Sequence, residues 1–168
     1  MLIVFAFVST VIGTIWAKVP FVPTPKKTNL AMIEAAELKG NEVVYDLGSG
    51  DGRMLIRAKK KYPGIRATGY EIVPMVWFLG RIRKIFLRSD VDLRFGDAFK
   101  ADISDADCIF LYMTTNLMVK LGKKFDKELK PGTKVISHAF QFWDKTPIKE
   151  VEVPAYFGCV DKIYVYEW

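Results

Sequence analysis

Three carboxylates in this sequence stand where strands are expected to end. Asp46 closes a first apolar run, Glu71 closes a second strand-like stretch, and Asp97 directly follows a third. Parallel strands that lie side by side bring their carboxyl ends to one edge of the sheet, which is where ligands bind in such sheets. Carboxylates gathered there can accept hydrogen bonds from amines and from hydroxyl groups.

A turn rich in glycine follows the first carboxylate. In the stretch DLGSGDGR, Gly48, Gly50 and Gly52 recur at every second position. Glycine allows a tight turn and a close approach of the backbone to a ligand, and the helix that follows offers free N–H groups. A dinucleotide-binding turn has the longer spacing G-x-G-x-x-G. Because Asp46 would also repel a pyrophosphate, the turn favours a ligand with a cationic amino group and no phosphate.

The three carboxylates and the turn together describe a pocket for an adenosine that bears an amino acid. Glu71 is placed to accept hydrogen bonds from the hydroxyls of a ribose. Asp97 is placed to accept one from the exocyclic amine of an adenine. Each residue also has a plainer interpretation: Glu71 as a charge at a strand end, and Asp97 as a turn residue after Gly96. In combination they favour S-adenosylmethionine as the cofactor.

The elements that would position these residues alternate between helix and strand. A helix is predicted from Thr28 to Gly40, with Thr28 or Asn29 as its N-cap, and a hairpin-like pair of strands closes the chain. The alternation predicts a Rossmann-like α/β fold, with a seven-stranded, mainly parallel sheet and helices on both faces. Cys108 lies in an apolar run and is expected in the core. Two cysteines and one histidine do not form a pattern of metal ligands, so no metal is expected.

The same stretches resemble the class I methyltransferases. VVYDLGSGDGR is similar to their first motif, GYEI to their ribose-binding strand and GDAF to their adenine motif. With PFVPTPKK, TTNLM and KELKPGTKVISHAF, the likeness from about residue 20 to residue 168 extends to a group of protein-lysine methyltransferases. That group includes the enzymes that modify the ATP synthase c subunit and the adenine nucleotide translocase, and a broad-specificity archaeal enzyme. The resemblance implies methyl transfer from S-adenosylmethionine to a lysine of a protein substrate.

The resemblance also implies roles for individual residues. Those it places at the cofactor are Pro23, Thr24, Pro25, Asp46, Gly48, Ser49, Gly50, Gly52, Glu71, Asp97, Ala98 and Phe99. It also implies that Thr115 and Asn116 line the acceptor side. Further candidates near the mouth of the site are His138, Phe140, Phe142 and Trp143, with a strand-end or packing role as the alternative. No residue is identified as a catalytic base. The sequence departs from the archaeal pattern at Ala139, where an acid is expected. If that acid orients the incoming lysine, the alanine alters the substrate or the activity.

The chemistry of lysine methylation needs little from the protein beyond position and desolvation. The cofactor supplies the electrophile, and an apolar entrance favours the neutral amine by lowering the pKa of the lysine. Roughly 140 residues remain after residue 27, about one minimal domain. A chain of that size has no room for a lid, so an open site that admits a side chain of a larger partner is expected.

The first 17 residues carry no charged side chain and predict a single-pass membrane anchor. As a helix they would span roughly 25 Å, close to the thickness of a bilayer core. Lys18, Lys26 and Lys27 follow, and the positive-inside rule then places the catalytic domain in the cytoplasm. A signal peptide would need a positive n-region, which is absent here, and a buried core helix is the other alternative. Residues 18–27 form a proline-rich lead-in, and residues 28–168 form the methyltransferase domain.

Other functions remain open on the sequence alone. The formal net charge of +6 also suits a nucleic acid. Amino-group methylation of bases favours Asn-Pro-Pro-aromatic after the fourth strand, but this chain has MTTN there, which argues against a nucleic-acid partner. The alternatives are a small-molecule, lipid or RNA methyltransferase held at the membrane, and a binding module without turnover. A membrane protein with an accessible lysine near the cytoplasmic interface is the expected substrate.

Overall fold

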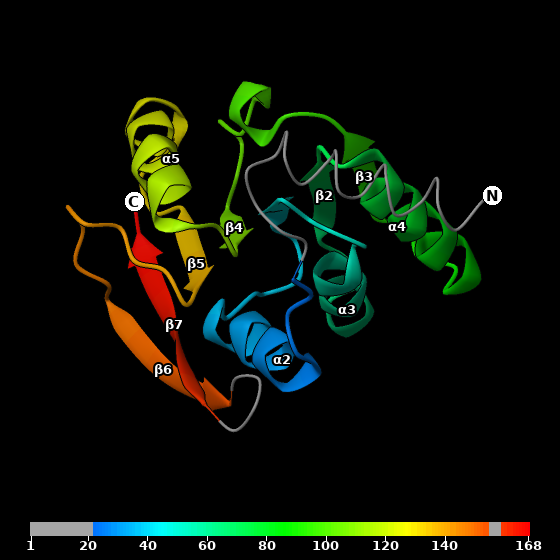
Figure 1. Cartoon of the computed structure of the whole chain (residues 1–168), viewed down its shortest axis with the longest axis horizontal. Coiled ribbons are helices and arrows are strands. Elements are labelled where there is room, and N and C mark those ends of the chain that lie inside the picture. The colour runs from blue at the N-terminus through cyan, green and yellow to red at the C-terminus, as the bar shows by residue number, and fades with distance from the viewer. Residues whose placement is uncertain (1–21, 155–158) are drawn as a thin grey trace.

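The computed structural model of the protein describes residues 22–154 and 159–168, and the predicted anchor at residues 1–17 lies outside them. Within these ranges, seven strands form one sheet in the order β3-β2-β1-β4-β5-β7-β6 (Figure 1). The pairs among β1 to β5 are parallel, whereas β7 runs antiparallel to both β5 and β6. The predicted seven-stranded, mainly parallel sheet is therefore confirmed. None of the helices in this part of the chain is long and apolar enough to cross a membrane.

The elements alternate along the chain as the sequence predicts. The strands are β1 (Val43–Leu47), β2 (Arg66–Glu71), β3 (Asp92–Phe95), β4 (Cys108–Leu111), β5 (Lys134–His138), β6 (Lys149–Pro154) and β7 (Val160–Glu167). The helices are α2 (Lys26–Ala35), α3 (Arg53–Lys61), α4 (Pro74–Phe86) and α5 (Thr115–Glu128), with a short 3-10 turn η1 (Ala98–Lys100) after β3. Each parallel strand is thus followed by a turn at the same edge of the sheet.

Helices cover both faces of the sheet (Figure 1). On one face, Val44 of β1 packs in a cluster with residues of α2 and α3, and Trp77 of α4 packs against it. On the other face, Tyr45 and Leu47 pack in a cluster with residues of α5. Successive side chains of a strand point to opposite faces, so β1 contributes to both clusters. Cys108 lies in the core, as predicted.

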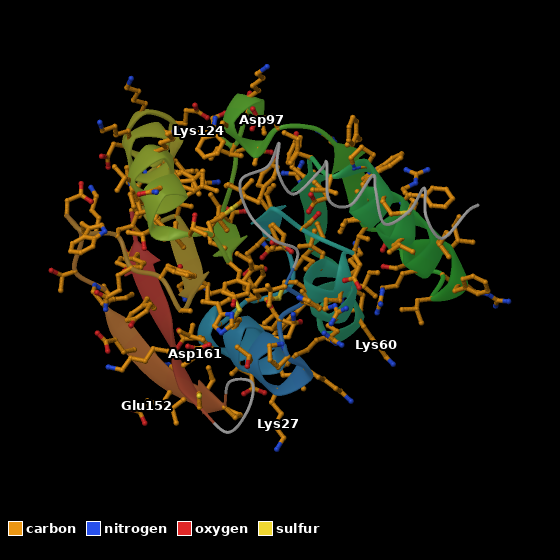
Figure 2. The ribbon with its side chains drawn as sticks, in the orientation of Figure 1. Lys27, Lys60, Asp97, Lys124, Glu152 and Asp161 are labelled. Atoms are coloured by element: carbon orange, nitrogen blue, oxygen red, sulfur yellow. The ribbon has the colours of Figure 1, made fainter. Side chains whose placement is uncertain are left out.

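The first described helix begins earlier than the sequence indicates, and it ends at Ala35 and not at the predicted Gly40. α2 starts at Lys26 with Pro25 as its N-cap, and no side chain caps it. Thr28 and Asn29 lie inside the helix and are fully buried, whereas Lys27 of the same helix points outward (Figure 2). The Thr28 hydroxyl donates a hydrogen bond to the carbonyl oxygen of Pro154, 3.1 Å away in β6. The prediction of Thr28 or Asn29 as the cap was therefore wrong, because both side chains are directed into the interior.

Candidate functional site

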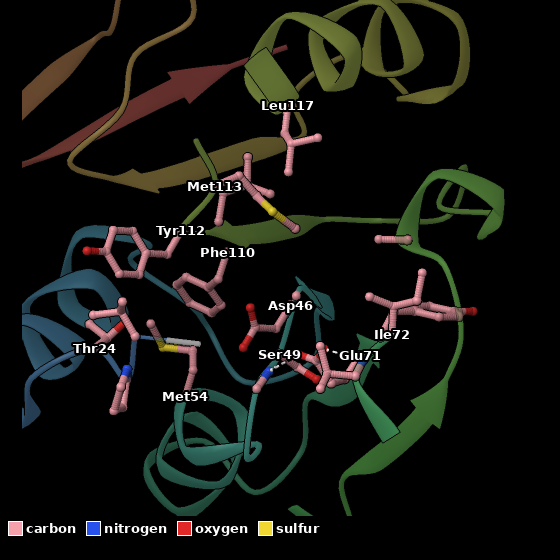
Figure 3. A pocket seen from close by; sticks show the side chains of 18 of the residues that line it. Thr24, Asp46, Ser49, Met54, Glu71, Ile72, Phe110, Tyr112, Met113 and Leu117 are labelled. Carbon is pink, nitrogen blue, oxygen red and sulfur yellow. Dashed lines mark hydrogen bonds between the residues drawn. The ribbon is translucent and has the colours of Figure 1, made fainter. Parts of the chain in front are cut away.

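A cavity of about 450 Å³ opens at the carboxyl edge of the sheet (Figure 3). Its wall includes residues that directly follow β1, β2, β3 and β4, which is where a doubly wound sheet binds its ligand. Its volume lies within the usual range for sites that bind small molecules. The sequence-predicted residues that line it are Pro23, Thr24, Asp46, Gly48, Ser49, Gly50, Glu71, Asp97, Ala98 and Phe99.

The glycine turn between β1 and α3 is held against β2. The amides of Gly48 and Ser49 both donate to the carbonyl oxygen of Tyr70, each at 2.9 Å. Gly48 has a φ of 80°, in the left-handed region, and a Cβ added there would lie 2.7 Å from Cε of Met113. Position 48 therefore requires glycine, because of its backbone conformation and because Met113, which follows β4, leaves no space for a side chain. Gly52 starts α3 as its N-cap and does not line the cavity.

Glu71 braces this turn from the end of β2. Its two carboxylate oxygens accept hydrogen bonds from the backbone amides of Val73 at 2.8 Å and Gly50 at 2.9 Å. Burial raises the pKa of the Glu71 carboxyl, although hydrogen bonds from the amides of Val73, Gly50 and Ile72 act in the opposite direction. Each oxygen keeps a further lone pair, so the carboxylate can still accept hydrogen bonds from a ligand. Glu71 therefore both shapes the turn and faces the cavity.

Asp46 lies in the middle of the cavity, between Phe110 and Ser49 (Figure 3). Burial raises the pKa of Asp46 to about 8, and the charges of Glu71 and Asp51 add to the effect. A ligand that carries a cation would stabilise the charged form of this buried carboxyl.

The adjacent Asp51 is already neutralised by the protein itself. Arg53 and Arg83 lie 2.7 Å and 2.8 Å from its carboxylate. Burial alone would raise the pKa of Asp51, but the hydrogen bonds and charge of Arg53, together with the charge of Arg83, lower it. The pKa of Asp46 is thus raised and that of Asp51 lowered, and Asp46 is the one suited to a cationic ligand.

Asp97 opens the short turn η1 after β3. One of its carboxylate oxygens accepts a hydrogen bond from the amide of Phe99 at 2.9 Å. The turn-forming interpretation of Asp97 is therefore correct, and it is compatible with a ligand role because the residue also lines the cavity. Ala98, Phe99 and Ile72 line the same end and offer apolar surface for a flat ring.

Asn29 is a cavity residue that sequence reasoning missed as a ligand-binding group. It is 0% exposed, lines the cavity, and neither its amide oxygen nor its amide nitrogen has a hydrogen-bond partner among the described residues. The Ser49 hydroxyl is in the same condition. A buried polar group without a partner costs about 1–3 kcal/mol, so such groups mark places that a polar ligand or water fills. The signal in the sequence was the position of Asn29 three residues before Met32, on the same side of a helix. The sequence favoured Asn29 as a possible cap instead.

Of the predicted acceptor-side residues, Phe140 lines the cavity, whereas Thr115, Asn116, His138, Phe142 and Trp143 do not. Thr115 begins α5, Asn116 is exposed, and His138 is buried at the end of β5. The predicted Pro25 is likewise outside the lining, as the N-cap of α2.

Aromatic and apolar residues line the cavity near the place where the acceptor was expected. Tyr112, Met113, Leu117 and Phe140 form this wall, together with Lys120. His138 lies behind it, with its ring centre 4.3 Å from that of Tyr112. Burial lowers the pKa of His138, and Asp161, 3.2 Å from its Nε2 atom, acts in the opposite direction. His138 therefore contacts two residues of the cavity wall, Tyr112 through its ring and Phe140 through a backbone hydrogen bond, and the sequence did not indicate Tyr112.

The comparisons with known proteins decide what the cavity binds. The family model described as ANTKMT methyltransferase domain matches residues 46–149. The chain belongs to this methyltransferase family. The match begins at Asp46 and includes the glycine turn, Glu71 and Asp97.

Individual relatives agree with this assignment. A protein-lysine N-methyltransferase of Saccharolobus islandicus (strain REY15A) is 38% identical over 138 residues, which cover 80% of this chain and 86% of that protein. The human lysine N-methyltransferase of the ATP synthase c subunit is 31% identical over 130 residues, 76% of this chain and 54% of that protein. The chain thus spans about half the length of the human relative. A solved structure titled as an RNA methyltransferase from Salinibacter ruber, in complex with S-adenosyl-L-homocysteine, has a TM-score of 0.80 and 36% identity, over 87% of this chain and 93% of that one.

S-adenosylmethionine is the cofactor of this methyltransferase, and the residues of the cavity fit it. The buried acid Asp46 and the unpartnered groups of Asn29 and Ser49 suit an amino acid with both charges. Glu71 suits a ribose, and Asp97 beside Phe99 suits an adenine. The cavity thus offers polar groups at both ends of an elongated ligand that carries no phosphate.

Proposed function

We propose that this methyltransferase transfers methyl groups to the ε-amino group of a lysine in a protein substrate. The observation that carries the proposal is the wall formed by Tyr112, Met113 and Phe140, which gives the cavity an aromatic and apolar acceptor side. The relatives named as lysine methyltransferases support the same acceptor. The residues predicted for the cofactor keep their roles in this proposal: Asp46 at the amino group, Glu71 at the ribose and Asp97 at the adenine.

The wall also explains how a lysine becomes a nucleophile without a dedicated base. Aromatic faces attract a lysine ammonium, and the loss of water around it then favours the neutral amine. Lys120 at the rim adds a positive charge, which lowers the pKa of an approaching lysine further. S-adenosylmethionine supplies the methyl group and the leaving group. The protein's own part is to hold the amine in line and dry.

RNA is the second candidate acceptor. The likeness to the structure titled as an RNA methyltransferase, at 36% identity, and the net charge of +6 favour it. The residues that follow the fourth strand argue against RNA. Methylation of a base at an amino group is expected to use Asn-Pro-Pro-aromatic there, whereas Met113–Asn116 have the sequence MTTN.

The test is to incubate the full-length protein with methyl-labelled S-adenosylmethionine and with membranes and cytosol from its own source. The reaction is divided and treated with protease, with ribonuclease or with lipid solvent before the label is counted. We expect the label to be sensitive to protease alone, and to be absent with the matched variant Asp46→Asn. Label that ribonuclease or solvent removes would replace the lysine proposal with the RNA or the lipid alternative.

We further propose that residues 1–17 anchor the chain in a membrane with its catalytic domain in the cytoplasm. The absence of charged residues in this segment and the lysines that follow it support the proposal. Removal of residues 1–17 should leave the affinity for S-adenosylmethionine unchanged and reduce methylation of membrane substrates. Equal methylation of those substrates by the truncated chain would contradict a targeting role for the segment.

A further inference from the structure

Helix α4 is packed against the sheet along one side only. Gly80 faces inward so closely that an added Cβ would lie 3.1 Å from the side chain of Leu93 in β3. The indole of Trp77 donates a hydrogen bond to the carbonyl oxygen of Leu93 at 2.9 Å, and Val76 is buried. These inward residues fix which side of α4 is left facing outward.

The outward side of α4 is apolar. We call the residues Phe78, Leu79, Ile82, Ile85 and Phe86 the α4 face; their spacing of three and four places them on one stripe of the helix. Phe78 is 53% exposed, Ile85 is 70% exposed and Phe86 is 82% exposed. Monomeric soluble proteins seldom expose so many large apolar side chains together, and such patches mark surfaces that bind a partner.

The apolar surface continues to the rim of the cofactor cavity. Ile72, just before α4, is exposed and lines the cavity. Phe95 at the end of β3 is exposed as well, and its ring centre lies 5.8 Å from that of Trp77. A partner bound to the α4 face therefore lies next to the mouth of the methyltransferase site.

Cations flank the α4 face, and carboxylates are absent from it. Residues 72–89 contain four basic residues and no aspartate or glutamate. Arg83 is paired with Asp51, but no ion pair joins Arg81, Lys84 or Arg88 to a carboxylate in residues 22–154 or 159–168. A hydrogen bond from Lys59, its ion-pair partner, lowers the pKa of the exposed Asp90, and the charge of Lys84 adds to the effect. Arg81 and Lys84 are three positions apart and form a second stripe of α4 beside the apolar one. Arg88 follows just after the C-cap Leu87, at the same end of the helix.

Charge complementarity distinguishes between the surfaces that could cover this face. Residues 1–17 are apolar but carry no charged side chain, so they offer no partner for Arg81, Lys84 and Arg88. A second copy of the chain would bring like charges together. Anionic lipid headgroups over an apolar interior match both stripes at once, and an apolar stripe with a basic border is the pattern of helices that lie in a membrane interface.

We propose that the α4 face docks on the surface of an anionic lipid bilayer. The docking goes beyond the proposed function, since it requires neither a lysine acceptor nor an anchor at residues 1–17. It places the rim of the cavity beside the headgroups. Acceptors that project from the membrane surface then lie within reach of the site, whereas acceptors far from it do not.

The experiment uses the full-length chain reconstituted in lipid nanodiscs. Cys159, the exposed cysteine, is changed to serine, and Cys108 is left because it is buried. An environment-sensitive fluorophore is then attached at Phe86→Cys, or at the control site Val119→Cys on the exposed side of α5. Fluorescence and quenching by iodide are recorded in detergent, in phosphatidylcholine discs and in discs that also contain phosphatidylglycerol. S-adenosylhomocysteine binding confirms that each labelled chain is folded.

We expect a blue shift and a loss of iodide quenching at position 86 in the anionic discs, with no change at position 119. The triple variant Arg81→Gln, Lys84→Gln, Arg88→Gln keeps the apolar stripe, and each lost cation should lower the ratio of docked to undocked protein about fivefold. Equal quenching at position 86 in all conditions would overturn the proposal. So would a label at position 86 that is shielded as fully in phosphatidylcholine discs as in anionic discs, because that result means that the cover of the face does not depend on anionic lipid.

Discussion

The raised pKa of Asp46 makes cofactor binding depend on pH in a way that one substitution can isolate. Burial and the charge of Glu71 raise the pKa of Asp46 to about 8, so the free protein holds this carboxyl protonated at neutral pH. The cationic amino group of the cofactor needs the ionised form. Binding must therefore release the proton, and the affinity weakens as the pH falls below about 8.

The size of the effect follows from the pKa. If only the ionised carboxyl binds, the dissociation constant rises by a factor of about 10 at pH 7 and about 100 at pH 6, relative to its limit at high pH. About 0.9 of a proton should be released per ligand bound at pH 7. The variant Asp46→Asn keeps the shape of the side chain and has no proton to lose, so its affinity should lack this dependence.

Titration calorimetry with S-adenosylhomocysteine measures both quantities without turnover. The ligand's own amino group titrates equally with both proteins, so the ratio of the two dissociation constants isolates Asp46. Repeating the titration in buffers of different ionisation enthalpy counts the released protons. A ratio that stays constant from pH 6 to pH 9, with no proton release at pH 7, would refute the assignment of Asp46 to the amino group.

Three further predictions concern stability and the neighbouring residues. Because the pKa of Asp46 is raised from 3.8 to about 8, the folded chain holds a proton that the unfolded chain has lost between those values. The free energy of unfolding of the cofactor-free protein should thus fall as pH rises through this window, by up to about 1.4 kcal/mol per pH unit, and thermal melts of Asp46→Asn should lack that contribution. Asn29→Leu removes two unpartnered polar atoms, so it should leave stability to urea unchanged or higher while weakening S-adenosylhomocysteine about tenfold or more. Gly48→Ala puts a Cβ 2.7 Å from Met113 at a φ of 80°, and should cost about 1–2 kcal/mol in urea unfolding and reduce cofactor affinity. Wild-type cofactor affinity of Asn29→Leu, or wild-type stability and affinity of Gly48→Ala, would contradict the roles given to these residues.

The sequence was most informative where the chemistry is local. Asp46 lies near the end of the buried strand β1, and Gly48 and Gly50 come just after it, so the type of residue and its position relative to the strand were enough to place them in the cavity. Glu71 was placed correctly as well, but its hydrogen bond to the amide of Gly50 joins segments 21 residues apart and no local pattern predicts it.

Features that depend on packing between distant segments could not be predicted. Thr28 contacts Pro154, 126 residues away, and that contact turns the first part of α2 inward. The predicted hairpin of β6 and β7 is present, but the insertion of β7 between β5 and β6 depends on the pairing of β7 with β5, a strand distant in the chain. His138 had the right chemistry for an acceptor-side residue, yet it packs against Tyr112 and does not itself line the cavity.

The departure at Ala139 remains a prediction about substrate choice. Ala139 follows β5 with a φ of 65°, and its amide donates a hydrogen bond to the carbonyl oxygen of Lys162 at 2.8 Å. The adjacent Phe140 lines the cavity, so a side chain at position 139 stands beside the acceptor wall. The variant Ala139→Glu therefore tests whether an acid here alters which lysines are methylated.

The chemical identity of the methylated product tests the central claim most directly. Full-length protein reacts with methyl-labelled S-adenosylmethionine and membranes from its own source, and the protein fraction is hydrolysed and chromatographed against mono-, di- and trimethyl-lysine. We expect label in methyl-lysine, and none above background with Asp46→Asn. Label in the protein fraction that elutes away from all three standards, or label in methyl-lysine that persists with Asp46→Asn, would contradict it.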